Sequence, residues 1–179
     1  MEEYTLRSTR THRNSAFRRA ADIAVVLLLC AGLLALLFKV LLVPERVTKE
    51  TVTGLSEGDL ILVDRFSKYL SDYKVGDIVA AEPAAGYGLY RIAALGGESY
   101  LVIDGQAFLD DNLIDEGSYS DGWPREAELY IEVPEDSVLL LPDERWGLED
   151  LEACLVRYND IRGEVRLRIY PADKLSLFY

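Results

Sequence analysis

The stretch Gly58-Asp59-Leu60-Ile61-Leu62-Val63 places a turn-forming pair directly before an apolar run of strand length. Runs of this kind, bounded by turn signals, indicate β-strands. Similar runs recur along the chain, and the predicted strands are residues 47–53, 59–64, 77–81, 88–94, 100–103, 129–133, 137–141 and 164–169. The sequence therefore predicts a mainly β domain of short, mostly antiparallel strands.

Glycine pairs supply the tight connections that such strands need. Five pairs offer a residue that tolerates positive φ: Gly76-Asp77, Gly96-Gly97, Asp104-Gly105, Asp121-Gly122 and Arg162-Gly163. Residues 148–158 alone have a helical spacing of leucines, and a loop with one turn fits them equally well. An antiparallel fold with at most one short helix is expected after residue 44.

An apolar segment precedes this domain. No charged residue occurs from Ile23 to Phe38, and apolar residues continue past Lys39 until Pro44 stops the helix, giving about 21 residues, enough to cross a bilayer. A buried core helix and a cleaved signal peptide are the alternatives. The run exceeds the usual apolar region of a signal peptide and lacks a small-x-small cleavage site. The sequence therefore predicts that residues 22–43 anchor the chain in a lipid bilayer.

Charge predicts the orientation of this anchor. The N-terminal arm, residues 1–21, contains five arginines, which the positive-inside rule keeps in the cytoplasm. Residues 44–179 contain 28 Asp or Glu against 13 Lys or Arg, a net charge of −15. We therefore expect a single-pass cell-membrane protein with an acidic extracytoplasmic domain, and this charge argues against a nucleic-acid partner.

Cysteine and histidine usage excludes several chemistries. Cys30 lies inside the predicted span and Cys154 is alone in the exterior domain, so no disulfide joins them. The only histidine, His12, lies in the cytoplasmic arm, which excludes a Ser-His-Asp mechanism and a histidine metal site outside. The acidic residues at 110–116 do not have the spacing of an EF-hand loop, so a solvated turn is expected. No metal or other cofactor is predicted.

Short motifs behind the anchor carry a family resemblance. They are Leu55-Ser56-Glu57-Gly58-Asp59-Leu60-Ile61-Leu62-Val63, Tyr73-Lys74-Val75-Gly76-Asp77-Ile78-Val79, Tyr90-Arg91-Ile92-Ala93-Ala94-Leu95-Gly96-Gly97-Glu98, Val102-Ile103-Asp104-Gly105, Val133-Pro134-Glu135-Asp136, Pro142-Asp143-Glu144-Arg145 and Gly163-Glu164-Val165-Arg166-Leu167-Arg168-Ile169-Tyr170-Pro171. In order and spacing they resemble bacterial signal peptidase I, the S26 family of membrane-anchored serine peptidases. The resemblance implies an antiparallel, barrel-like β fold behind one transmembrane helix.

Two positions depart from this family's Ser-Lys dyad. Glu50 stands eight residues before Gly58, in the nucleophile slot, and Tyr90 stands in the lysine slot. A carboxylate has no hydroxyl with which to form an ester intermediate, and a phenol with a pKa of ~10 keeps its proton at neutral pH. No intact catalytic pair is therefore expected, and a contact between Glu50 and the Tyr90 hydroxyl is predicted in its place.

An active peptidase with another nucleophile is the alternative. Thr51 is adjacent to the nucleophile slot, but the residue beside the lysine slot is Arg91, and a guanidinium has no free lone pair with which to act as a base. The exterior lysines upstream are Lys49, Lys68 and Lys74. A third reading is a structural membrane protein that retains only the fold.

The resemblance also implies the residues of a peptide groove and a structural motif. The predicted groove residues are Thr48, Glu50, Thr51, Val52, Tyr90 and Ile92, and the predicted structural residues are Gly58, Asp59, Asp143 and Arg145. In the family, the last two are expected to form a structural pair that braces the active-site strands. Core packing is expected for Tyr119, Trp123, Tyr130 and Trp146, with a membrane-dipping or peptide-gripping edge as the alternative.

Degenerate signal-peptidase-like proteins of Gram-positive bacteria, which assemble sortase-built pili, resemble this chain. This resemblance implies that the chain binds or chaperones a secreted or pilin-like polypeptide without cleaving it, with a sortase as a further candidate partner. An incoming peptide adding as a strand would be the mode of binding.

Overall fold

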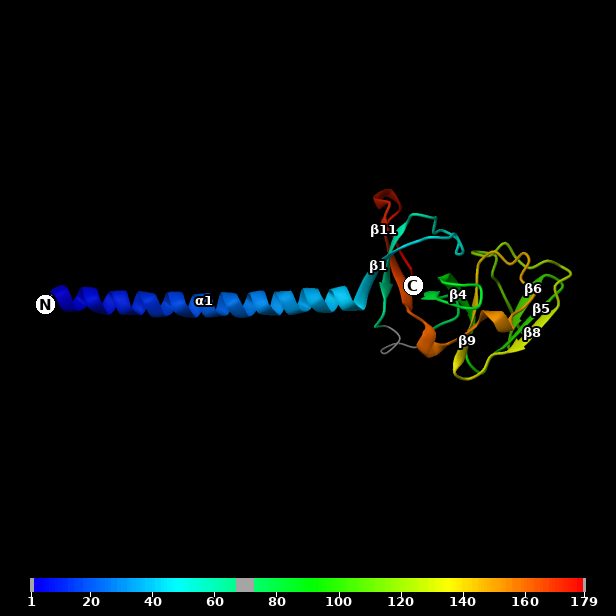
Figure 1. Ribbon diagram of the computed structural model, residues 1–179, viewed down its shortest axis with the longest axis horizontal. Coiled ribbons are helices and arrows are strands. Elements are labelled where there is room, and N and C mark those ends of the chain that lie inside the picture. Colours follow the sequence, from blue (N-terminus) through cyan, green and yellow to red (C-terminus); the bar gives the residue numbers. More distant parts are fainter. Residues whose placement is uncertain (1, 67–72, 179) are drawn as a thin grey trace. The chain divides into compact units, whose positions relative to one another are not determined.

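The computed structural model describes residues 2–66 and 73–178. The chain divides into two compact units, Met1–Val40 and Leu41–Tyr179, and the second is called the β domain here. Figure 1 shows a single long helix in the first unit and a β fold in the second.

Helix α1 spans Glu2–Leu41, and its stretch Phe17–Leu36 is long and apolar enough to cross a membrane, as an anchor or a signal sequence would. The protein covers none of this stretch. The helix ends at Leu41, so Leu42 and Val43, predicted as the end of the anchor, belong instead to strand β1. Pro44 disfavours a helical conformation in the residue before it, and its missing N–H is tolerated because β1 is an edge strand.

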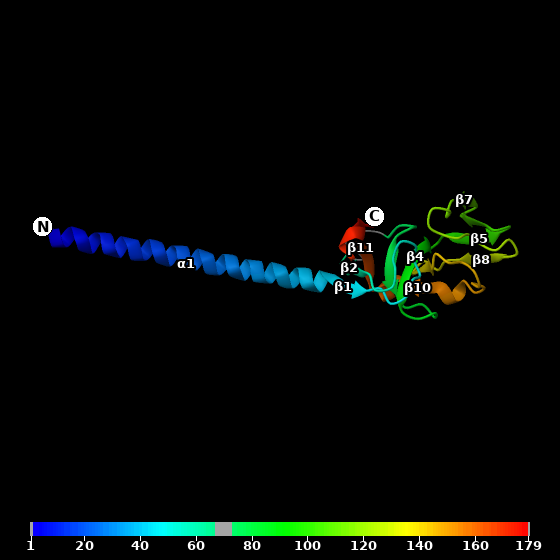
Figure 2. The same cartoon turned by 90° about the horizontal axis from the view of Figure 1, so that it is seen from above.

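The β domain contains two antiparallel sheets. Their strands are β1 (Leu42–Arg46), β2 (Leu60–Asp64), β3 (Ile78–Ala81), β4 (Gly88–Ala94), β5 (Ser99–Ile103), β6 (Gln106–Leu109), β7 (Asn112–Ile114), β8 (Leu129–Glu132), β9 (Ser137–Leu141), β10 (Leu155–Arg157), β11 (Gly163–Tyr170) and β12 (Ser176–Leu177). The larger sheet has the order β1-β2-β11-β3-β4-β9-β10, with β12 paired to β11, and curls into a half-barrel (Figure 2). The smaller sheet has the order β7-β6-β5-β8. The predicted mainly β, antiparallel, barrel-like fold is confirmed.

Seven predicted strands coincide with β2, β3, β4, β5, β8, β9 and β11, within one residue at each end. The prediction for residues 47–53 is wrong, because this segment is a loop and the strand lies just before it, at β1. The sequence did not reveal β1, β6, β7, β10 or β12, four of which have two to four residues and one of which contains proline. Residues 148–158 hold the short 3-10 helix η1 (Glu152–Cys154), then β10, and the first residue of η2 (Tyr158–Asp160), so they do not form an α-helix.

Apolar side chains cover both faces of the central strands. In β4, Leu89 packs with Val52 and Val63 on one face, while Tyr90 and Ile92 pack on the other. A third cluster lies between the two sheets and contains Ala94 and Leu139 from the larger sheet and Tyr100, Val102 and Ile131 from the smaller one. This burial on both faces explains why β3 is apolar throughout, and why β4 is apolar except at Arg91, rather than alternating.

We expect the substitution Gly163→Ala to lower the free energy of unfolding by about 1–3 kcal/mol, the usual cost of overpacking. Strands β11 and β2 approach closely here, and a Cβ at Gly163 would lie 2.6 Å from the Asp64 carbonyl oxygen and 2.7 Å from Val63. Urea unfolding of the full chain in detergent micelles, followed by circular dichroism, measures the change. The control is Gly117→Ala, whose Cβ would meet only the Asp115 carboxylate, at 3.1 Å. Equal stability of both variants would contradict the close approach.

Candidate functional site

The loop of residues 47–58 is fixed at both ends by the Gly58-Asp59 motif. The Val47 amide donates to the Asp59 carbonyl at 2.9 Å, and the Gly58 amide donates to the Val47 carbonyl at 2.8 Å. Gly58 adopts a φ of 91°, which glycine permits without strain. The buried Asp59 carboxylate accepts the Ser56 amide at 3.1 Å and pairs with Arg168 at 3.2 Å. The motif therefore closes the loop.

The middle of this loop lies against β4 and the end of β9. Thr51 donates its hydroxyl to the Leu89 carbonyl at 2.5 Å, and its own carbonyl accepts the Asp143 amide at 2.8 Å. The Thr53 amide donates to Asp143 Oδ2 at 2.7 Å, and the Thr53 hydroxyl donates to the Tyr119 carbonyl at 2.6 Å. The loop is thus held next to the residue that precedes Tyr90.

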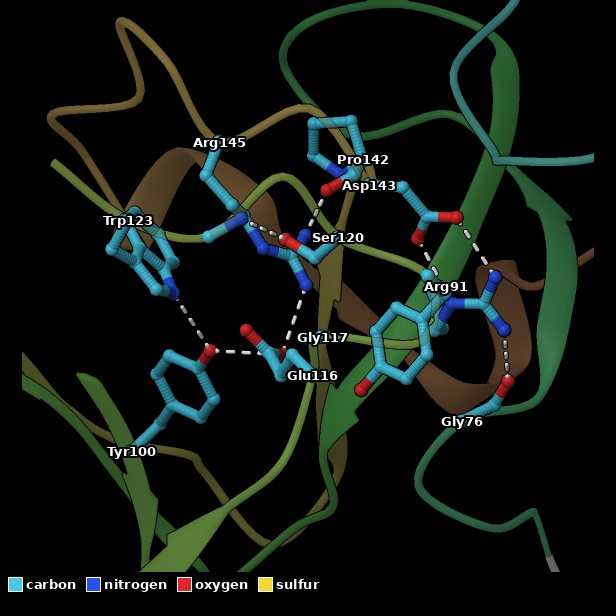
Figure 3. Close-up of polar contacts among 12 residues, drawn as sticks. Gly76, Arg91, Tyr100, Glu116, Gly117, Ser120, Trp123, Pro142, Asp143 and Arg145 are labelled. Carbon is cyan, nitrogen blue, oxygen red and sulfur yellow. Dashed lines mark hydrogen bonds and ion pairs between the residues drawn. The ribbon is translucent and has the colours of Figure 1, made fainter. Parts of the chain in front are cut away.

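Asp143 links this loop to β4 through a two-point ion pair with Arg91, visible in Figure 3. Arg91 donates from Nε to Oδ1 at 2.9 Å and from Nη2 to Oδ2 at 2.8 Å, and its Nη1 donates to the Gly76 carbonyl at 2.9 Å. The guanidinium also stacks over the Tyr119 ring, 4.1 Å from the centroid. A planar guanidinium is suited to this paired contact, so one buried carboxylate joins three segments of the chain.

Arg145, fully buried, belongs to a second network. It pairs with Glu116 at 2.9 Å and donates to the Pro142 carbonyl (Figure 3). Glu116 also accepts the Tyr100 hydroxyl at 3.2 Å, and that hydroxyl accepts the Trp123 indole N–H at 3.3 Å. Burial and the Glu116 charge raise the pKa of Tyr100, so its hydroxyl stays protonated and can donate.

The expected pair between Asp143 and Arg145 is corrected by these contacts. Each residue is buried, but Asp143 pairs with Arg91 and Arg145 pairs with Glu116. Two separate ion pairs brace the site, one holding the loop to β4 and the other holding the 115–121 segment to the chain after β9.

Glu50 and Tyr90 do not make the predicted contact. Tyr90 is buried and its hydroxyl donates to the Gly86 carbonyl at 2.9 Å, while Glu50 is exposed and accepts no hydrogen bond from the residues that the structure describes. Neighbouring residues of a strand face opposite sides, and Leu89 is the one that packs with Val52 on the loop side. Burial raises the pKa of Tyr90, which keeps the phenol neutral.

The predicted groove residues are therefore not gathered on one surface. Val52, Tyr90 and Ile92 are buried in core clusters, whereas Thr48 and Glu50 are exposed and Thr51 is half-buried. The buried three pack with the core because the strand and its loop present their apolar residues to the interior, so they are corrected to core residues.

A small, shallow depression with a volume of about 10 Å³ lies beside the loop and is called the loop cleft here. Its lining residues are Glu45, Arg46, Val47, Thr48, Lys49, Ile61, Tyr87, Gly88 and Leu89. Tyr87 forms one wall, because its hydroxyl donates to the Glu45 carboxylate and the Arg162 guanidinium covers its ring at 4.4 Å. Burial and the hydrogen bond to Glu45 raise the Tyr87 pKa. Of the predicted groove residues only Thr48 lines this cleft, and sequence reasoning missed Tyr87, although an aromatic between Gly86 and Gly88 at the start of a strand is a usable signal.

No lysine amine donates to Thr51 within residues 2–66 and 73–178. Lys49 and Lys74 are exposed, so neither has the burial that lets a lysine act as a base, and Lys68 lies outside the described residues. Cys154 is buried, and that burial raises the pKa of its thiol and disfavours a nucleophilic thiolate.

The acidic residues at 110–116 lie partly in a turn and partly in an ion pair. Asp110 accepts the Ser99 amide at 2.8 Å, and Asp110 and Asp111 both have positive φ between β6 and β7. Glu116 is occupied by Arg145. Among the described residues no group of three or more His, Cys, Asp or Glu is arranged to hold a metal ion.

The four aromatic residues expected in the core divide into two kinds. Trp123 is buried and Tyr119 half-buried, both beside arginines. Tyr130 is 61% exposed and Trp146 66% exposed, so core packing is wrong for these two.

Comparison with known proteins identifies a family for this chain. A family model described as "Signal peptidase, peptidase S26" matches residues 18–170. Among solved structures, the chain is similar to a signal peptidase I from Enterococcus faecalis V583, with 16% sequence identity and a TM-score of 0.42, over 52% of this chain and 97% of that chain. No curated protein matches the sequence.

Proposed function

Because this chain belongs to the signal peptidase S26 family, we propose that it is a membrane-tethered member that binds polypeptides without cleaving them. The observation that carries the proposal is the state of the lysine slot. Tyr90, which the resemblance aligns with the family's lysine, is buried, and its hydroxyl donates to the Gly86 carbonyl at 2.9 Å. A neutral phenol that already donates to a carbonyl cannot take a proton from a nucleophile.

The nucleophile slot supports the same conclusion. Glu50 is exposed and carries no hydroxyl, and the neighbouring Thr51 hydroxyl donates to the Leu89 carbonyl at 2.5 Å. A hydroxyl becomes an effective nucleophile when a base accepts its proton. A backbone carbonyl is not such a base, so the alternative of a Thr51-dependent peptidase is the weaker one.

The loop cleft is the proposed binding surface. It lies beside the edge strand β1, and the buried Gly88 and Leu89 at the start of β4 form its floor. Strand addition at a sheet edge supplies main-chain hydrogen bonds, and adjacent shallow pockets select small side chains. Binding of this kind needs none of the dyad chemistry.

We further propose the location and the client class. Helix α1 would be an uncleaved anchor, and the five arginines of residues 1–21 would stay in the cytoplasm, leaving the β domain outside. A secreted or surface polypeptide is then the client, pilin-like by the resemblance to Gram-positive pilus assembly proteins, with a sortase as a candidate partner.

The experiment compares binding and cleavage on one substrate. The full chain in detergent micelles is mixed with a fluorescent peptide containing a small-x-small signal-peptidase site. We expect saturable binding and an intact peptide by mass spectrometry. Tyr87→Ala should weaken binding about tenfold, the scale of an aromatic hot spot, while Tyr170→Ala, equally aromatic and 59% exposed outside the cleft, should not.

Cleavage is the contrary outcome. A peptide cut by the full chain, with activity lost in Thr51→Ala, would establish the peptidase alternative. Absence of binding by the unaltered chain would support the third reading, a structural membrane protein.

A further inference from the structure

The smaller sheet carries a row of apolar residues on its outer face. Tyr130 in β8 is paired with Leu101 in β5, Leu101 with Phe108 in β6, and Phe108 with Leu113 in β7. Directly paired residues of antiparallel strands lie on the same face of a sheet. These four side chains therefore form one line across all four strands, called the outer row here.

The outer row faces solvent. Tyr130 is 61% exposed and Leu113 is 59% exposed, with Leu101 and Phe108 partly exposed between them. The opposite face of the same strands supplies Tyr100, Val102, Ala107 and Ile131 to the core between the sheets. An antiparallel sheet with one buried face normally presents polar residues on the other, so a contiguous apolar row on the second face indicates a contact surface.

Acidic residues surround this row. Residues 99–135 contain ten Asp or Glu and one basic residue, Arg125, a net charge of −9. Asp110, Asp111, Glu128 and Glu132 are exposed, and the Tyr130 hydroxyl itself donates to Glu132 at 2.8 Å. The surface thus combines an apolar strip with a strongly negative margin.

We propose that the outer row is a second docking surface, for a polypeptide segment in which apolar residues alternate with or are flanked by lysine or arginine. The apolar side chains would cover the row while the basic side chains reach the carboxylates around it. Complementary charge of this kind increases the association rate and excludes acidic partners.

Charge also favours this partner over two other possible occupants of the outer row, a second copy of the chain and a lipid bilayer. Two copies of the chain would bring two acidic margins together, and an anionic bilayer would repel the same exposed carboxylates. A basic apolar segment gains from both features of the surface.

The outer row is separate from the loop cleft. The row belongs to the sheet β7-β6-β5-β8, whereas the cleft is lined from β1, β2 and β4 of the larger sheet, and Figures 1 and 2 place β5 and β8 at the opposite end of the β domain from β11. The proposal therefore goes beyond the function proposed for the loop cleft. Tyr87→Ala, which alters the cleft, should leave peptide binding at the outer row unchanged.

The test uses the full chain in nanodiscs of zwitterionic lipid and a fluorescent ten-residue peptide of alternating leucine and lysine, with empty nanodiscs as the blank. We expect binding of this peptide and no binding of the leucine–glutamate or serine–lysine counterparts. Leu113→Ser with Tyr130→Ser should weaken binding at least tenfold. Asp111→Asn with Glu128→Gln should weaken it about threefold and reduce its dependence on salt.

The matched control is Leu175→Ser with Tyr170→Ser, which removes the same two residue types at positions 65% and 59% exposed that do not belong to the smaller sheet. An equal loss in this control, or no loss in the outer-row variant, would overturn the proposal. Concentration-dependent dimerisation that the outer-row variant abolishes would identify a second copy as the occupant. Binding to anionic vesicles that the same variant abolishes would identify a membrane as the occupant. Dimerisation or vesicle binding of this kind would each contradict the proposal of a basic apolar segment.

Discussion

Replacing Arg145 by leucine is expected to lower the free energy of unfolding by about 3–5 kcal/mol, the cost of removing one partner from a buried ion pair. The side chain of Arg145 is fully buried and that of Glu116 is 6% exposed. Leucine would leave the Glu116 carboxylate in the interior with the Tyr100 hydroxyl as its remaining described donor. The uncompensated charge, rather than the lost volume, dominates the loss.

Urea unfolding of the full chain in detergent micelles measures this effect, with circular dichroism as the probe. The double variant Arg145→Leu/Glu116→Leu should recover at least half of the loss, because removing both charges removes the desolvation cost of each. Arg157→Leu is the control: its pair with Asp160 is 3.7 Å long and both side chains are more than half exposed, so a change below about 0.5 kcal/mol is expected. A similar change in Arg145→Leu would show that the buried pair contributes nothing.

Asp143→Ala is expected to cost about as much, ~3–5 kcal/mol, and to release the loop as well. The substitution removes the two carboxylate acceptors of Arg91, leaving the Gly76 carbonyl, and it removes the acceptor of the Thr53 amide. Asp143→Asn keeps one oxygen in place but loses the charge, so we expect an intermediate loss. Hydrogen exchange of the Thr53 amide should accelerate at least tenfold in the alanine variant, since its only described acceptor is gone.

The exposed Asp173, which lies in the short 3-10 helix Ala172–Lys174, is the matched control. Asp173→Ala should change neither the free energy of unfolding beyond about 0.5 kcal/mol nor the exchange of Thr53. Global destabilisation by Asp143→Ala with unchanged relative protection of Thr53 would contradict the role assigned to the loop contact.

Most of the fold could be predicted because local pattern and tertiary packing agree in it. The apolar runs at 59–64, 88–94 and 137–141 become β2, β4 and β9, and burial of their apolar side chains stabilises these strands. Residues 47–53 have the composition of a strand, but their backbone groups bond to Asp59 and Asp143 instead of a ladder partner. Such long-range partners leave no local mark in the sequence.

The site was predictable in its motifs and not in its contacts. Gly58-Asp59 and Asp143 were identified by their place in the family order, and they do hold the loop. Asp59, Asp143 and Arg145 pair with Arg168, Arg91 and Glu116, respectively. These partners stand between 29 and 109 residues away in the chain, so only the folded topology brings them together. Tyr90 faces away from the loop because Leu89, its neighbour in the strand, faces toward it. The motif alone does not specify which of the two residues faces the loop.

The attachment of the loop bears on which substitutions the chain tolerates. The loop is held by the backbone of Val47 and Thr51, by the Thr53 amide and by Asp143, and residue 50 contributes no described contact. We therefore expect most side-chain replacements at position 50 to change the free energy of unfolding by less than about 0.5 kcal/mol. The contacts that secure the shape of the loop therefore leave the identity of residue 50 unconstrained.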